Sequence, residues 1–319
     1  MVGSRAGRIT FRWRSGAVVA AVAIAGLALS ASAQATFPGV NGRIAFVRGA
    51  DIYTMRPDGQ GVRQLTRFTD GGSAFFESWS PDGRLIVFNE YFSDAPAKVW
   101  LMAADGSGRR LLPTEPDFGV EAPRFSPDGK SIVFAHASPN PLMRTAIWRM
   151  KLDGTDRTPL TPFDQEVFNF HPGFSPDGAS VAFTSLARDG VISGVYAMAA
   201  ADGSGVRLIT PPALQACCPD WAPDGGRLAF MSHVYAPDFD PQHDAVWVVR
   251  PDGTGLKHLT HPGARFDVDP SWSPQGDAIA FQRFSPDRSS AAVYVMNPNG
   301  GGLKKIQDDA QLPRWGARR

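Results

Sequence analysis

Six polar side chains of this chain are of types that could meet around one ligand. They are carboxylates, an amide and an imidazole, each within five residues before a large aromatic residue: Glu77, Glu121, Asn169, His171, Asp267 and Asp269. Carboxylates that converge with a histidine can bind a cation, an amine or a basic peptide segment. The same groups can instead bond the backbone at strand ends or ordered water, and the sequence leaves this alternative open.

A second group of candidate metal ligands lies between residues 233 and 244. It contains two imidazoles and three carboxylates: His233, Asp238, Asp240, His243 and Asp244. These side chains are ligand types for zinc or calcium. Their spacing, however, matches neither a His-Glu-x-x-His helix nor an acidic calcium-binding loop. We therefore interpret the segment as a solvated polar loop and keep metal binding as the weaker alternative.

The two cysteines of the chain, Cys217 and Cys218, are adjacent. Two adjacent thiols are too few for a metal site by themselves, and they do not form a disulfide framework. A vicinal disulfide between Cys217 and Cys218, or a buried structural pair of thiols, is favoured over a redox role.

A repeated turn accompanies these candidate residues. Ser80-Pro81-Asp82-Gly83 has the residue order of a type I turn, because proline presets φ, aspartate bonds the local backbone and glycine accepts the left-handed conformation. The turn recurs at residues 126–129, 175–178, 222–225 and 273–276, with one substitution in each of the last two copies. The aromatic residues before the five turns are 46, 49, 47 and 51 residues apart, and 43 more residues lead to Trp315. This period is typical of a four-stranded propeller blade.

Each repeat predicts four strands. They are the aromatic segment, a run ending in Phe such as 85–88, an apolar segment with an aromatic residue such as 99–102, and a piece after an Asp-Gly or Asn-Gly turn. Residues 42–46 form a second strand with no first strand before it, and the missing aromatic strand appears only at 313–315. We therefore predict an all-β fold, a six-bladed β-propeller of four-stranded blades whose first blade is closed by the C-terminal strand. Most aromatic residues should then lie between blades.

The N-terminus predicts an export signal. Four arginines precede the apolar run 17–29, and Ala31-Ser32-Ala33 fits a cleavage site before Gln34. The run is short for a membrane span, and an uncleaved anchor helix is the alternative. We expect a signal peptide over residues 1–33 and a single propeller domain over residues 34–319. The exported protein should lie in the periplasm, in the cell envelope or outside the cell, with no membrane span after cleavage. Without the four arginines the chain has 28 basic and 31 acidic residues, a net charge of about −3 that does not favour nucleic acid.

The Trp-Ser-Pro-Asp-Gly core, recurring between residue 40 and Trp315, resembles the TolB-like β-propeller family, whose repeats are similar to WD40 repeats. The resemblance implies an exported ring that contacts envelope proteins. TolB proteins also carry an α/β domain before the propeller, which we do not expect here. In prolyl-oligopeptidase-type enzymes such repeats precede a hydrolase domain with a Gly-x-Ser-x-Gly turn, a pattern that this sequence lacks.

The two ends of the predicted ring differ in character. The short Pro-Asp-Gly and Asp-Gly turns share one face, whereas the loops of variable length share the other, where binding residues usually lie. We predict a monomeric, non-enzymatic binding module without a cofactor, which recognises an envelope or extracellular protein or peptide through the variable-loop face and the channel mouth. The alternative is a metal-assisted lyase or hydrolase that acts on a polysaccharide or lactone, with a divalent cation at the channel mouth. A third hypothesis is a sensor of a small solute. The sequence assigns no catalytic residue.

Overall fold

The computed structural model describes residues 37–69, 71–92, 95–114, 119–137, 145–164, 166–187, 193–232, 245–261, 263 and 265–318. These residues form 24 strands and one short 3-10 helix, η1 (Pro212–Leu214). Within these ranges, the chain has no helix of the length and apolarity that crossing a membrane requires. The predicted signal segment and the candidate ligands of loop 233–244 lie outside the described residues.

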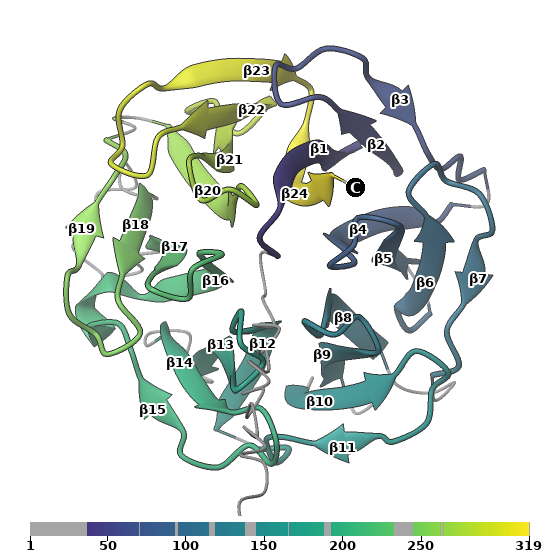
Figure 1. Cartoon of the computed structure of the whole chain (residues 1–319), viewed down its shortest axis with the longest axis vertical. Coiled ribbons are helices and arrows are strands. Elements are labelled where there is room, and N and C mark those ends of the chain that lie inside the picture. Colours follow the sequence, from purple (N-terminus) through teal and green to yellow (C-terminus); the bar gives the residue numbers. More distant parts are fainter. Residues whose placement is uncertain are drawn as a thin grey trace, which may run out of the picture. The chain divides into compact units, whose positions relative to one another are not determined.

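The strands form six antiparallel sheets of four, arranged around a central axis (Figure 1). The innermost strands, which carry the aromatic segments, are β4 (Ser73–Trp79), β8 (Gly119–Phe125), β12 (Val167–Phe174), β16 (Ala216–Trp221), β20 (Phe266–Trp272) and β24 (Gln311–Arg318). The second strands are β1 (Val40–Arg48), β5 (Leu85–Tyr91), β9 (Ser131–Ala137), β13 (Ser180–Ala187), β17 (Leu228–Ser232) and β21 (Ile279–Phe284). The predicted all-β, six-bladed propeller is confirmed.

The outer half of each blade consists of a third strand and a shorter fourth strand. The third strands are β2 (Asp51–Met55), β6 (Lys98–Ala103), β10 (Thr145–Lys151), β14 (Ser193–Ala199), β18 (Ala245–Val249) and β22 (Ala291–Met296). The fourth strands are β3 (Arg63–Gln64), β7 (Arg110–Leu111), β11 (Thr158–Pro159), β15 (Arg207–Leu208), β19 (Lys257–His258) and β23 (Lys304–Asp308).

The C-terminal strand closes the first blade, as predicted. β24 pairs antiparallel with β1, with Ile44 opposite Trp315. The closing strand is also held from the next blade, because the indole nitrogen of Trp79 donates to the carbonyl of Arg314 at 3.1 Å. Ring closure gives β1 an inner partner, so the inner edge of β1 is not left open to recruit another strand.

The repeated turn has the predicted geometry. The amide of Gly83 donates to the Ser80 carbonyl at 2.9 Å, and Gly83 has a φ of 65°. The Ser80 hydroxyl donates to Asp82 at 2.7 Å and accepts from the Leu85 amide at 2.9 Å, which locks the turn to the second strand. In the last blade, where Gln replaces this Asp, Asp277 accepts the serine hydroxyl instead.

The hydrophobic core lies between neighbouring blades. All six phenylalanines of the second strands are buried, and so are the five aromatic residues that precede the repeated turns and Trp315 of the closing strand. The aromatic residues of the third strands are only half-buried, because they pack from the outer part of each blade. The prediction that most aromatic residues are inter-blade core is therefore confirmed, with the third strands at the margin of that core.

Candidate binding site at the channel mouth

Every inner strand is interrupted by a bulge three residues before its aromatic residue, where its pairing with the second strand shifts register. The residues at the bulges have φ between 48° and 59°, and none is a glycine: Phe76, Ala122, His171, Cys218, Asp269 and Leu312. We call these six residues the mouth ring. A left-handed conformation costs a residue with a Cβ about 1–2 kcal/mol, so the surrounding sheet must impose it.

A proline follows the left-handed residue in five of the six inner strands. Proline has no N–H, so the bulge leaves no unpaired backbone donor at that point. The exception is β4, where Glu77 takes the place of the proline.

Aromatic side chains surround His171 at the end of the channel opposite the repeated turns. The Phe76 ring lies 5.2 Å from the His171 ring although one blade separates the blades of the two residues, so this contact runs through the channel past the blade between them. Phe170 lies 4.9 Å from the His171 ring, and Tyr91 packs against Phe76 at 6.3 Å and against Phe75 at 5.5 Å. These aromatic side chains are half-buried. The short side chain of Ala122, in the blade between, leaves room for the contact.

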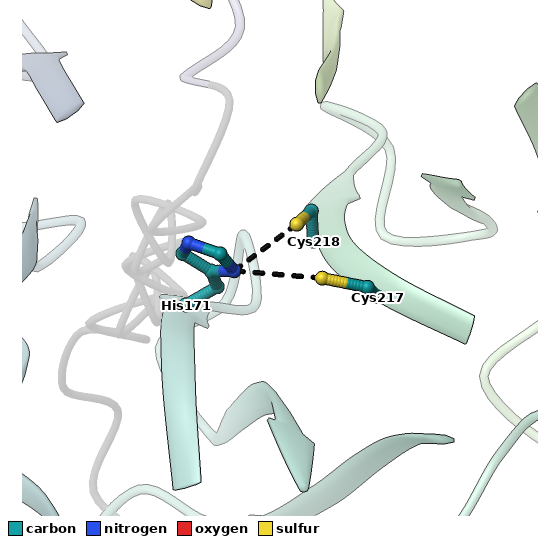
Figure 2. A group of neighbouring side chains, drawn as sticks. All are labelled: His171, Cys217 and Cys218. Carbon is teal, nitrogen blue, oxygen red and sulfur yellow. Dashed lines mark hydrogen bonds between the residues drawn. The ribbon is translucent and has the colours of Figure 1, made fainter. Parts of the chain in front are cut away.

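The two cysteines meet the same histidine. The Nδ1 atom of His171 lies 3.0 Å from Sγ of Cys218 and 3.6 Å from Sγ of Cys217 (Figure 2). Both cysteines are buried free thiols in the structure, so the predicted vicinal disulfide stays a prediction. A hydrogen bond from Cys218, assisted by His171, lowers the pKa of Cys217 to about 6 against the effect of burial, whereas burial raises the pKa of Cys218.

Two of the predicted carboxylates are half-buried beside this cluster. Asp269 is the mouth-ring residue of the blade after Cys218, and Glu121 directly precedes Ala122. Burial raises the pKa of Glu121, and the nearby His171 offsets part of this rise. Together with His171, these carboxylates are the members of the predicted set that the structure leaves accessible at the mouth.

The other three predicted residues point into the protein. Glu77 is fully buried, and neither of its carboxyl oxygens has a hydrogen-bond partner in the described part of the chain. Asn169 is buried and donates to the Thr161 hydroxyl at 3.4 Å. Asp267 is buried and accepts two hydrogen bonds from Arg283, at 2.5 and 2.6 Å. Asn169 and Asp267 are therefore held by other side chains, whereas the alternative stated from the sequence named backbone groups or ordered water as their partners.

A charged layer lies between the mouth ring and the repeated turns. The residue just before each aromatic lines a cavity of about 40 Å³, and this set comprises Ser78, Arg124, Gly173, Asp220, Ser271 and Arg314. Such a volume has room for a few water molecules and no larger ligand. Burial lowers the pKa of Arg124 to about 10, with repulsion from Arg314 acting in the same direction. Burial also raises the pKa of Glu77 to about 7, which its own backbone amide, Arg314 and Arg124 only partly oppose.

Sequence reasoning missed the aromatic residues of the mouth and this charged layer. The predicted residues included neither Phe76 and Phe170 nor the two arginines, Arg124 and Arg314. Aligning the six repeats position by position would have found both sets, because the mouth ring and the charged layer each occupy one repeat position.

No family model matches the chain. Among curated proteins, it is 30% identical over 213 residues to the uncharacterized protein Atu1656 of Agrobacterium fabrum, a match that covers 65% of this chain and 69% of the relative. It is 31% identical over 100 residues to the uncharacterized peptidase YuxL of Bacillus subtilis, covering 30% of this chain and 15% of that protein. It is 33% identical over 92 residues to the Tol-Pal system protein TolB of Nitratidesulfovibrio vulgaris, covering 28% of this chain and 20% of that protein.

Solved structures show the same fold. A protein from Agrobacterium tumefaciens assigned as TolB superposes with a TM-score of 0.67 and 22% identity, covering 83% of this chain and 88% of that one. TolB from Acinetobacter baumannii superposes with a TM-score of 0.69 and 18% identity, covering 87% of this chain and 67% of that one.

Proposed function

The chain belongs to the TolB-like β-propeller family, and from this premise we propose that it is an exported, non-enzymatic module that binds a segment of an envelope or extracellular protein at its channel mouth. The fold supports a protein-binding propeller. The basic, apolar and small-residue order of residues 1–33 supports export.

One observation carries the choice of the channel mouth. Four half-buried aromatic side chains, Phe75, Phe76, Tyr91 and Phe170, gather around His171 on a closed ring. Aromatic side chains that are already immobilised contribute large contact area at small entropic cost, and they dominate protein-binding hot spots.

The neighbouring carboxylates indicate the chemistry of the bound segment. Glu121 and Asp269 are half-buried beside the aromatic cluster, and the described chain offers no ion pair to either of them. We therefore expect the ligand to combine an aromatic or aliphatic side chain, which packs on Phe76 and Tyr91, with a Lys or Arg that approaches a carboxylate.

The test is a selection of random peptides on the immobilised full-length chain, followed by fluorescence anisotropy with the selected sequence. Enriched peptides should share an apolar and a basic residue. Phe76→Ala and Glu121→Gln should each weaken binding about ten-fold or more, while Leu208→Ala, at an exposed apolar residue of β15, should leave it unchanged.

A selection without a shared pattern, or equal affinities for Phe76→Ala and Leu208→Ala, would show the proposal to be wrong. Turnover of a polysaccharide or lactone by the same purified protein would favour the catalytic alternative instead.

A further inference from the structure

The atoms of three ligand-type side chains converge at one point of the mouth, beside the aromatic cluster used above and sharing His171 with it. Nδ1 of His171 and the Sγ atoms of Cys217 and Cys218 all lie within 4.8 Å of one another. Figure 2 shows the two thiols, from β16, directed at the same ring nitrogen, from β12. Among the described residues, this is the only group of three or more His, Cys, Asp or Glu side chains with such spacing.

The backbone holds two of the three donors in place. His171 and Cys218 are mouth-ring residues of adjacent blades, with φ of 49° and 59°. The Cys218 amide donates to the Thr184 hydroxyl at 3.0 Å, and the rings of Phe76 and Phe170 contact the imidazole from two directions. This hydrogen bond and these ring contacts restrict the orientation of the donor side chains, and restricted donors favour metal binding.

We propose that Nδ1 of His171 and the Sγ atoms of Cys217 and Cys218 form a binding site for a thiophilic d¹⁰ cation, Zn²⁺ or Cu⁺. Thiolate and imidazole are the ligands that these ions prefer, whereas magnesium and calcium require oxygen. Two thiolates neutralise Zn²⁺, so the ion adds no net charge to a buried site, and three protein donors leave its fourth position open.

The distances fit this assignment. With Zn–S near 2.3 Å and Zn–N near 2.0–2.1 Å, a tetrahedral angle places sulfur and nitrogen about 3.6 Å apart. The Cys217 Sγ–His171 Nδ1 distance is 3.6 Å, and the Cys218 distance of 3.0 Å needs only to lengthen by several tenths of an ångström. The carboxylates of Asp269 and Glu121 lie near enough to act electrostatically on the cysteines and on His171, respectively, and their negative charge favours a cation.

Metal stoichiometry tests the site. The full chain, purified and reduced under nitrogen, is dialysed against micromolar Zn²⁺ and analysed by elemental mass spectrometry. About one equivalent should remain bound. Cys217→Ser, Cys218→Ser and His171→Asn should each weaken binding at least ten-fold in a chelator competition. His261→Asn, at an exposed histidine remote from the cluster, should not. Thermal melting without metal identifies any variant that fails to fold, and Zn²⁺ should raise the midpoint only when the three donors are intact.

Cobalt substitution reports the ligands directly. Co²⁺ should give a near-ultraviolet thiolate charge-transfer band that falls by about half in each single cysteine variant and is absent in the double variant. A Cu⁺ titration against a Cu⁺-selective chelator distinguishes the two ions, and the tighter one identifies the metal. Less than about 0.1 equivalent of either metal, or equal binding by the double cysteine variant, would overturn the proposal. So would a Cys217–Cys218 disulfide that survives reductant, detected by a mass lower by about two hydrogens.

Discussion

Replacing Glu77 by Gln should change how the stability of the protein depends on pH. Glu77 is fully buried without a hydrogen-bond partner in the described chain, and burial raises its pKa from 4.5 to about 7. The folded state therefore holds the Glu77 proton more tightly than the unfolded state does. This contribution is complete below pH 4.5 and is lost as pH rises through 7.

The size of the effect follows from the shift. A difference of about 2.5 pKa units corresponds to about 3 kcal/mol of unfolding free energy, at about 1.4 kcal/mol per unit. Glutamine resembles the neutral carboxyl in shape but does not ionise. The difference in unfolding free energy, Glu77→Gln minus parent, should therefore increase by about 3 kcal/mol between pH 4 and pH 8. Any effect of the substitution that does not depend on pH shifts this difference equally at all pH values.

Urea unfolding followed by tryptophan fluorescence, at several pH values from 4 to 8, measures this quantity. Glu166→Gln, at an exposed carboxylate, is the matched control and should run parallel to the parent protein. The prediction for Glu77→Gln is wrong if the difference in unfolding free energy between this variant and the parent changes by less than about 1 kcal/mol over that range, or changes in the opposite direction. Glu77 is then not a buried group that holds its proton in the folded state.

Three further outcomes are expected. Asp267→Asn should lower the free energy of unfolding by about 3–5 kcal/mol because it leaves the largely buried Arg283 unpaired, and a loss below 1 kcal/mol in chemical denaturation would contradict this. Gly203→Ala should destabilise the protein more than Gly129→Ala. Both glycines have positive φ, but only at Gly203 would the new Cβ collide with a main-chain carbonyl of the neighbouring blade. Equal melting temperatures of the two variants would refute this expectation. N-terminal sequencing of the secreted or periplasmic protein should start at Gln34, and an intact Met1 there would refute cleavage.

The fold was predictable because its signals are local and repeated. The residue types of a Ser-Pro-Asp-Gly turn specify its conformation within four residues. Trp315 identified the closing strand because the last repeat contains only a first strand and the first repeat lacks one. The bulges were not predictable in the same way, since non-glycine residues rarely adopt positive φ and only His171 and Asp269 are of types enriched there. Their one signal was the proline that follows five of them.

The candidate site was predictable only in part, because sequence distance hides which side chains share a layer. Glu77 and Glu121 look equivalent as carboxylates near the start of inner strands. Glu77 directly follows its bulge residue, whereas Glu121 directly precedes its own, and this difference of two positions buries Glu77 and leaves Glu121 half-buried. A bulge reverses the alternation of side chains along a strand, so a pattern of alternate residues cannot be extended across it.

The cysteine pair shows what the repeat adds to the chemistry of single residues. Two adjacent cysteines are too few for a metal site when only near neighbours in sequence are counted. His171 precedes Cys218 by 47 residues, the same interval that separates the aromatic residues Phe174 and Trp221 of their blades. Residues one period apart occupy the same position on adjacent blades, and a closed ring brings them together at the axis (Figure 1). In a propeller, a ligand set should therefore be sought at one repeat position across successive blades, where this chain has His171, Cys218 and Asp269 in order.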